Sequence, residues 1–326
     1  MTRILFIVVV LIVYGSLYPF QLRAPASHNG PFWQFLHAWP QKLGRGDIGD
    51  TVVNLLVYLP AGMFAFLALE RHGERRLRWI VPVLLCFALS CTMEFLQIFD
   101  KTRTCSLLDL LNNTLGGLIG VAVGASFRRS LSGPVLLILY WLGFQLCALF
   151  ILLVSPQARP GFLRSPLEAV TVLFAWAVVF RLYITRDETR RESWQSTALA
   201  VAFTALLIVR GLAPFHFQTT QAHFDWMPFN AMLRSEWIVG LPVFLEKSFY
   251  YGAAIWLWRC AGWRLDRATL FIAAILAAIE AVQLYLPGRT SEITDPLLAV
   301  LLGFMLWLLE QDFLQVSRPA MIRMQT

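Results

Sequence analysis

The stretch TMEFLQIFDKTRTCSLLDLLNNTLGGLIG, from Thr92 to Gly120, decides how this chain is organised. It joins two apolar runs through a short polar connection, and it places Glu94, Gln97, Arg103 and Asp109 at that junction. Ionisable residues at membrane depth are rare in apolar helices and usually have a function. We therefore interpret this junction as a candidate functional site.

The same polar pattern returns near the C-terminus in AIEAVQLYLPGRTSEITDPLLAVLLG, from Ala278 to Gly303. Five residues match at a constant separation of 186 positions, so the spacing E-x2-Q-x5-R-x5-D-x7-G is kept without a gap. The matching pairs are Glu94 and Glu280, Gln97 and Gln283, Arg103 and Arg289, Asp109 and Asp295, and Gly117 and Gly303. The pattern predicts an internal repeat.

The composition predicts a polytopic membrane protein, because 58% of the 326 residues are hydrophobic and only 14% are charged. A membrane-spanning helix needs about 20 apolar residues, so the chain has room for about ten. Long continuous apolar runs indicate an all-α helix bundle and not a β-barrel. The expected spans are 4–20, 51–70, 79–99, 107–126, 134–154, 167–184, 196–213, 237–258, 268–286 and 295–311.

Arginine clusters predict the orientation of these spans, because cytoplasmic loops carry an excess of Lys and Arg. All the clusters fall on one side of the membrane if the chain has ten spans. We therefore expect a bacterial inner (plasma) membrane protein with cytoplasmic termini and both polar motifs on the extracytoplasmic face. The net charge of +7 then reflects topology, and we expect no nucleic acid partner. The clusters are Arg3; Arg71, Arg75, Arg76 and Arg78; Arg128 and Arg129; Arg186, Arg190 and Arg191; Arg259, Arg264 and Arg267; and Arg318 and Arg323.

The repeat predicts three segments. Residues 1–126 form the first four-helix unit, residues 127–195 a two-helix linker, and residues 196–326 the second four-helix unit. Two linker spans return the chain to the same side, so the two units are expected to be parallel repeats. Arg3 and the apolar run after it resemble a signal peptide. However, GSLYPFQLR at 15–23 resembles RGLAPFHFQ at 210–218, which favours a retained first span.

Two further polar residues precede the first motif. Asp50 and Asn54 are four positions apart and share one face of an expected helix, which Pro60 is able to kink. Asp50 could instead be only the N-cap of that helix.

The fourth span also carries a polar and small-residue stripe. Asn113 follows Asp109 by one turn, and Gly116, Gly120 and Gly124 recur at every fourth position. Such glycines allow two helices to approach closely, and this packing could be their whole role. A structural role is also open for the charged residues of the motif. A buried ion pair among Glu94, Arg103 and Asp109 could serve only to hold the connection between the two apolar runs.

The second unit differs from the first at one cationic position. When VNLLVY of the first unit is aligned with EKSFYY of the second, Lys247 falls at Asn54 and Tyr251 at Tyr58. Lys247 could neutralise Glu280 or meet an anionic ligand. Glu246 points elsewhere, because adjacent helical residues lie about 100° apart. His216 and His223 lack a Cys or carboxylate partner at ligand spacing, so we expect no metal and no cofactor.

Together these motifs resemble the VanZ-like family of small bacterial membrane proteins. The resemblance rests on Asp50, Asn54, Pro60 and Gly62; on Glu94 and Gln97; and on Asp109, Asn113, Thr114, Gly116 and Gly117. It covers residues 1–126 well and residues 196–311 more loosely, which suggests tandem VanZ-like units. The family resemblance implies an integral membrane protein of the cell envelope and a link to resistance against teicoplanin-type lipoglycopeptides.

Two functions remain open at this level. The first is binding or translocation of an anionic envelope lipid, such as a polyprenyl phosphate or a glycolipid, with carboxylates orienting the arginines. Its ligand-binding residues would be Asp50, Asn54, Glu94, Gln97, Arg103, Asp109, Asn113, Lys247, Glu280, Gln283, Arg289 and Asp295.

The second function is a membrane-embedded enzyme that acts on a lipid-linked substrate, with acid–base candidates Glu94, Asp109, Glu280 and Asp295. The sequence lacks a nucleophile with an adjacent base, so we favour binding. The sequence does not identify protein partners.

Overall fold

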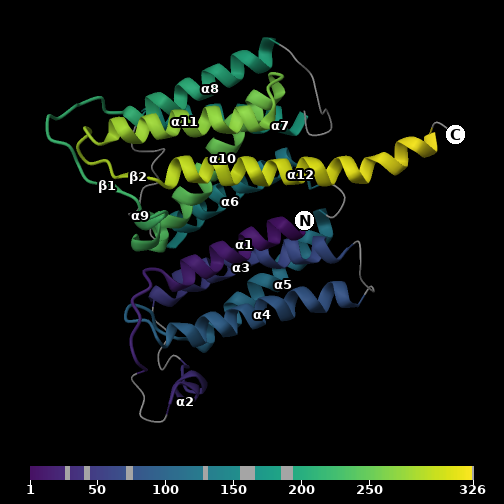
Figure 1. The fold of residues 1–326 in the computed structure, drawn as a ribbon, viewed down its shortest axis with the longest axis vertical. Coiled ribbons are helices and arrows are strands. Elements are labelled where there is room, and N and C mark those ends of the chain that lie inside the picture. Colours follow the sequence, from purple (N-terminus) through teal and green to yellow (C-terminus); the bar gives the residue numbers. More distant parts are fainter. Residues whose placement is uncertain are drawn as a thin grey trace. The chain divides into compact units, whose positions relative to one another are not determined.

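A computed structural model describes residues 1–25, 30–39, 45–70, 76–127, 131–154, 166–184 and 194–324. The chain forms two compact units, Met1–Ser130 and Leu131–Thr326 (Figure 1). Seven arginines used above to predict orientation lie outside the described residues: Arg71, Arg75, Arg128, Arg129, Arg186, Arg190 and Arg191.

The described residues of the first unit form four long helices and one short one. The long helix α3 packs mainly against α5, and also contacts α1 and α4. The short helix α2 is anchored by Phe35, which is buried with Ile98 and Leu110. The bounds are α1 Thr2–Leu17, α2 Pro31–Leu36, α3 Arg45–Leu69, α4 Leu77–Gln97 and α5 Leu107–Phe127.

Helix α3 begins earlier than the sequence predicted. It starts at Arg45, so Asp50 lies more than one turn inside the helix and is exposed. The N-cap interpretation of Asp50 is therefore wrong. Pro60 lies within the same helix, which continues to Leu69.

The predicted close approach of helices along the glycine stripe is confirmed. A Cβ atom added at Gly116 would lie 2.4 Å from the carbonyl oxygen of Leu55, and one at Gly120 would lie 2.0 Å from that of Leu59. Both oxygens belong to α3. The backbones of α3 and α5 are thus in contact, and only glycine fits at these positions.

The second unit surrounds one central helix. Helix α10 contacts α6, α8, α9, α11 and α12, while α7 packs on α6 and α8. Two residues each of β1 and β2 pair in parallel, with Phe224 opposite Ser291 and Asp225 opposite Glu292. The bounds are α6 Gly133–Val154, α7 Pro166–Ile184, α8 Trp194–Leu212, β1 Phe224–Asp225, α9 Asn230–Arg234, α10 Trp237–Cys260, α11 Leu265–Gln283, β2 Ser291–Glu292 and α12 Thr294–Met324.

Helices α6 and α7, which the sequence analysis took as a linker, belong to the second compact unit. Trp141 of α6 is fully buried, and its ring lies 4.8 Å from that of Phe249 on α10. Aromatic residues therefore join α6 to the central helix, because large rings bury much apolar surface at one contact.

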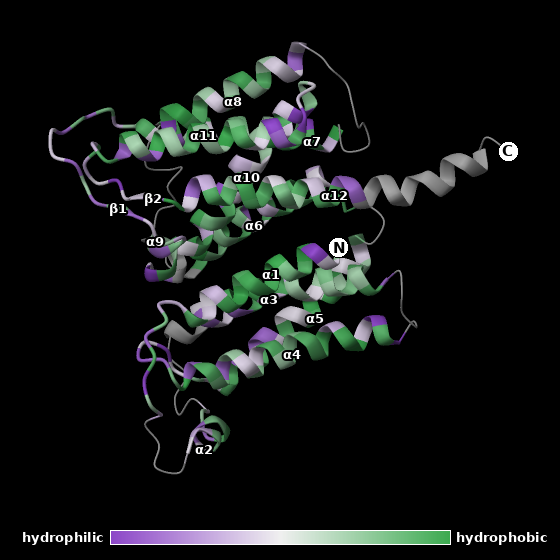
Figure 2. Cartoon of the chain, in the orientation of Figure 1, coloured by the Kyte–Doolittle hydropathy of each residue, from purple (hydrophilic) through white to green (hydrophobic). Residues whose placement is uncertain are grey.

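Each of the ten expected spans coincides with a helix, and most of their length is apolar (Figure 2). Among the described residues, seven helices are long and apolar enough to cross a membrane: α3, α4, α5, α6, α7, α8 and α12. Helix α1 is apolar but shorter. Helix α10 contains Glu246 and Lys247, and helix α11 contains Asp266, Arg267 and Glu280. The count of ten spans is therefore not confirmed.

Candidate functional site

Arg103 lies at one end of the first unit and binds the end of α1. Its Nε donates to the carbonyl oxygen of Tyr18 at 3.1 Å, and its Nη2 donates to that of Gly15 at 3.0 Å. The last carbonyl groups of a helix lack partners within the helix and carry partial negative charge. The guanidinium group therefore caps α1, and neutral carbonyl groups orient it where the sequence analysis expected carboxylates.

Glu94 and Gln97 attach two other segments at the same end. The side-chain amide of Gln97 donates to the carbonyl oxygen of Ser16 at 3.0 Å. The Glu94 carboxylate accepts the backbone N–H of Ser106 at 2.8 Å. Ser106 in turn caps α5, because its hydroxyl accepts the backbone N–H of Asp109 at 3.3 Å. Side chains of one motif therefore join the end of α1, the end of α4 and the start of α5.

One turn deeper, polar side chains connect α4 and α5. The Asn113 amide donates to the Ser90 hydroxyl at 2.9 Å, and both side chains are buried. The Asn113 Oδ1 atom is also buried, and it has no hydrogen-bond partner in the described part of the unit. The neighbouring Asn112 donates to Thr51 of α3 at 3.0 Å. A polar strip thus continues inward from the motif.

The second unit repeats the contacts of the first. Arg289 donates through Nε and Nη2 to the carbonyl oxygen of Ala213, at 3.2 and 2.7 Å, and through Nη2 to that of Arg210 at 3.2 Å. Gln283 donates to the carbonyl oxygen of Gly211 at 2.9 Å, and Glu280 accepts the backbone N–H of Glu292 at 2.9 Å.

The acceptors also correspond between the two units. Arg210, Gly211 and Ala213 follow Gly15, Ser16 and Tyr18 by 195 positions. Phe20 and Phe215, two residues after Tyr18 and Ala213, both have positive φ, at 61° and 63°. The end of α8 in the second unit thus has the same local structure as the end of α1 in the first.

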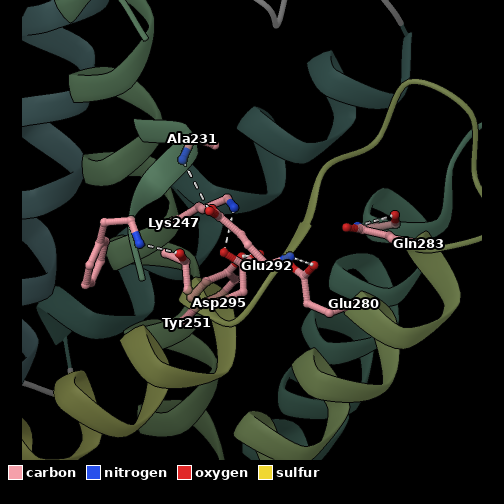
Figure 3. Close-up of polar contacts among 10 residues, drawn as sticks. Ala231, Lys247, Tyr251, Glu280, Gln283, Glu292 and Asp295 are labelled. Carbon is pink, nitrogen blue, oxygen red and sulfur yellow. Dashed lines mark hydrogen bonds and ion pairs between the residues drawn. The ribbon is translucent and has the colours of Figure 1, made fainter. Parts of the chain in front are cut away.

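Lys247 has a definite partner within the second unit. Its Nζ lies 2.6 Å from Oδ1 of Asp295, and the hydroxyl of Tyr251 donates to the other oxygen of Asp295 at 2.5 Å (Figure 3). Lys247 thus forms an ion pair with Asp295, a partner that neither alternative from the sequence named. Glu292 lies beside this pair and accepts the backbone N–H of Ala231 at 3.3 Å. Burial raises the pKa of Glu292 above its ordinary value.

Glu246 has a different partner from Lys247, as expected from their positions on the helix. Its carboxylate lies 2.8 Å from Nη2 of Arg210 on α8, and the same guanidinium lies 5.0 Å from the centre of the Tyr250 ring. Sequence reasoning assigned no role to Arg210. The signal in the sequence that could have predicted this pair was an arginine at the end of one apolar span together with a glutamate inside another.

The thiol nearest to the motif is a weak nucleophile. Burial, with Glu94 and Asp109 nearby, raises the pKa of Cys105 to about 12. Among the described residues, no group of three or more His, Cys, Asp or Glu is arranged to hold a metal ion. His216 and His223 lie in the segment between α8 and α9.

Comparison with known proteins identifies the first unit. The family model for VanZ/LLP1 matches residues 3–128, which include α1 to α5 and the first polar motif. No curated protein and no solved structure matches the chain. The predicted VanZ-like character is therefore confirmed for the first unit. This match and the apolar helices indicate that the chain is a multi-pass membrane protein.

Proposed function

We propose that this protein binds an anionic envelope lipid at the extracytoplasmic ends of its two units, and that it is not an enzyme. The lipid would present a phosphate group, as in a polyprenyl phosphate or a phosphate-bearing glycolipid. We also propose that the second unit is a divergent copy of the first. The constant spacing of the motif and the repeated carbonyl contacts of Arg103 and Arg289 support this relationship.

One observation carries the binding proposal. In each unit a guanidinium group is fixed by Nε and Nη2, while none of its contacts with the described residues involves Nη1 or a carboxylate. Arg103 is half-buried and Arg289 is exposed. A guanidinium that is held in place keeps its full charge and retains donors for a phosphate oxygen. Backbone contacts thus position the two cations without neutralising them.

The other motif residues would act indirectly. Glu94 and Glu280 each accept a backbone N–H of the connection that carries the arginine, and Gln97 and Gln283 each bind the helix end that the arginine caps. Replacing these Glu and Gln residues would displace the guanidinium groups, but it would not remove a direct contact with the phosphate. Asp50, Asn54 and Asn113 lie on the same two helices as the close backbone contact of the first unit.

The enzymatic alternative has weaker support. Glu94, its first candidate base, is 3% exposed and already accepts the Ser106 N–H. The hydroxyl of Ser106 is occupied as a helix cap. A general base must reach a substrate proton directly or through one water molecule. A resistance role for this chain would follow from lipid binding if the bound lipid is a target of the antibiotic.

The test is mass spectrometry of lipids that co-purify with the full chain in native-membrane nanodiscs. Wild type is compared with Arg103→Ala plus Arg289→Ala, and with a control, Lys101→Ala plus Arg264→Ala, that removes two exposed cations outside the proposed contacts. We expect one enriched phosphate-bearing lipid in wild type and control, and its loss in the arginine variant. If the alanine variant does not fold, the double variant Arg103→Lys plus Arg289→Lys takes its place in the comparison. Equal lipid content in all samples would overturn the proposal.

A further inference from the structure

The short helix α2 presents apolar side chains in two directions. Phe35 is 8% exposed and packs against Ile98, just after α4, and against Leu110 of α5. Leu36 points about 100° away from its neighbour Phe35, and it shares a face with the residue four positions before it. Four large apolar side chains of this segment are each at least 50% exposed: Phe32, Trp33, Leu36 and Trp39. One face of α2 is therefore bound to the first unit, while another apolar face is open.

Contacts with α4 and α5 fix the orientation of α2. The Phe35 ring meets that of Phe95 on α4 edge-on, with 6.2 Å between the ring centres. The carbonyl oxygen of Ala38, beyond the end of α2, accepts the backbone N–H of Leu107, the first residue of α5, at 2.9 Å. An isolated helix of six residues is unstable in water, so these contacts and not the propensity of α2 maintain it. They also hold its open face in a fixed direction.

The open face of α2 lies at the level where α4 ends. Helix α4 is long and apolar enough to cross a membrane, and it ends at Gln97, within the first motif. Figure 1 shows α2 beside this end of α4 and not along its length. Large exposed apolar residues follow α4 from its start to its last turn: Leu77, Trp79, Ile80, Val81, Leu84, Leu85, Phe87 and Leu96. In a membrane-spanning helix such a surface faces lipid, so the lipid-facing surface of α4 reaches the level of α2.

The composition of α2 suits the boundary between water and hydrocarbon. Residues 30–39 read GPFWQFLHAW and contain no Asp, Glu, Lys or Arg. Tryptophan is enriched at membrane–water interfaces, because its ring is apolar and its N–H needs a polar partner. A six-residue helix leaves most of its backbone N–H and C=O groups without partners inside the helix, which disfavours the hydrocarbon centre. The open apolar face in turn disfavours water.

We propose that α2 lies in the membrane interface at the motif end of the first unit, with Phe32, Trp33, Leu36 and Trp39 inserted between the lipid headgroups and the first acyl carbons. Its partner is the bilayer surface and not a protein, because the open face adjoins a surface that already faces lipid. Aromatic interfacial segments insert in this way by about 5–10 Å.

This position also sets the height of the bilayer around the first motif. Cys105 and Leu107, which follow Arg103 in the chain, pack against the cluster that holds Phe35. The headgroups around the unit therefore lie near the height of Arg103. The inference concerns bulk lipid around the first unit, and it stands whether or not a specific lipid binds to that arginine.

The test measures tryptophan fluorescence of the full chain at one copy per lipid nanodisc. Because the chain has 12 Trp, the emission of chosen residues is obtained by subtracting the spectrum of a Trp→Phe variant from that of wild type. The probe variant is Trp33→Phe plus Trp39→Phe, which replaces exposed side chains and leaves the buried contacts of α2 intact. Trp79→Phe, on the lipid-facing surface of α4, and Trp141→Phe, in the core of the second unit, are the controls. The quenchers are lipids brominated near the headgroup or near the chain end, and iodide in the water.

We expect lipid brominated near the headgroup to quench Trp33 and Trp39 at least half as strongly as Trp79, and more strongly than lipid brominated near the chain end. Iodide should quench them at least threefold less than free tryptophan in water. Trp141 should respond to neither quencher. Weaker quenching by the brominated lipid would overturn the inference: with strong iodide quenching it would place α2 in water, and without it against protein. Stronger quenching from the chain end would also overturn it.

The same measurement separates this inference from the proposed function. Arg103→Ala plus Arg289→Ala should leave the quenching of Trp33 and Trp39 unchanged. If wild type holds no enriched lipid but the quenching is as expected, the proposed function fails and α2 still lies in the interface. If an enriched lipid depends on the two arginines but iodide alone quenches Trp33 and Trp39, only the inference about α2 fails.

Discussion

The contact between α3 and α5 leads to a graded prediction for three glycine-to-alanine substitutions. A Cβ atom would lie 2.0 Å from the Leu59 oxygen at position 120, 2.4 Å from the Leu55 oxygen at position 116, and 3.0 Å from the Met63 oxygen at position 124. In each case the contacted atom is backbone and is unable to rotate away. The required separation of the two helices therefore falls from position 120 to position 124.

The change in the free energy of unfolding of each variant is the sum of two opposing effects. Alanine favours a helix over glycine by about 1 kcal/mol. Overpacking of a closely packed contact costs about 1–3 kcal/mol, and at Gly120 the helices must separate by at least about 1 Å to relieve the contact. We therefore expect Gly120→Ala to lower the free energy of unfolding by about 2 kcal/mol, Gly116→Ala by less, and Gly124→Ala to be nearly neutral.

A cysteine-accessibility assay measures the stability of the first unit alone. Cys86 is fully buried in the first unit, and a Cβ atom at Gly117 would lie 2.6 Å from its sulfur. With Cys91, Cys105, Cys147 and Cys260 replaced by Ser, the temperature at which Cys86 reacts with a fluorogenic maleimide measures opening of this core. Equal reaction temperatures for Gly120→Ala and Gly124→Ala would refute the claim that backbone contact determines the cost.

Three other predictions follow from the site. Arg103→Lys should destabilise the first unit by about 1–2 kcal/mol, because one ammonium group does not reproduce two directed hydrogen bonds. The control Lys101→Ala should not change the temperature at which Cys86 reacts. Lys101→Cys, exposed beside the motif, should react rapidly with an impermeant maleimide at pH 7.5, whereas Cys105, with a pKa of about 12, should react slowly; equal rates would contradict the burial of Cys105. In wild type we expect the free energy of unfolding to fall as the pH rises above about 4.5, because the folded-state pKa of Glu292 is raised and the folded state binds its proton more tightly. Glu292→Gln should abolish this pH dependence. Lys247 and Asp295 also face Glu292, so parallel pH profiles of variant and wild type would show that they and not Glu292 cause the dependence.

The sequence alone determined the membrane class, the helices and the location of the two polar motifs. Apolar runs long enough to span a bilayer have few alternatives to helices, since lipid offers no hydrogen bonds to the backbone. The motif spacing was also readable, because it is fixed by helix periodicity and by a connection of constant length. The glycine stripe predicted a close helix contact for the same reason, and the partner of that contact was found in α3.

Only the tertiary structure decided what the charged residues contact. Arg103 and Arg289 bind carbonyl groups more than 70 positions away in the sequence, and no spacing rule predicts such partners. Lys247 pairs with Asp295 and Glu246 with Arg210, because packing of α10 between α8 and α12 brings those side chains together. Asp50 changed from a possible cap to an interior helical residue, since α3 starts at Arg45. Periodicity determines which residues share a helix face, but the packing of helices determines which faces meet.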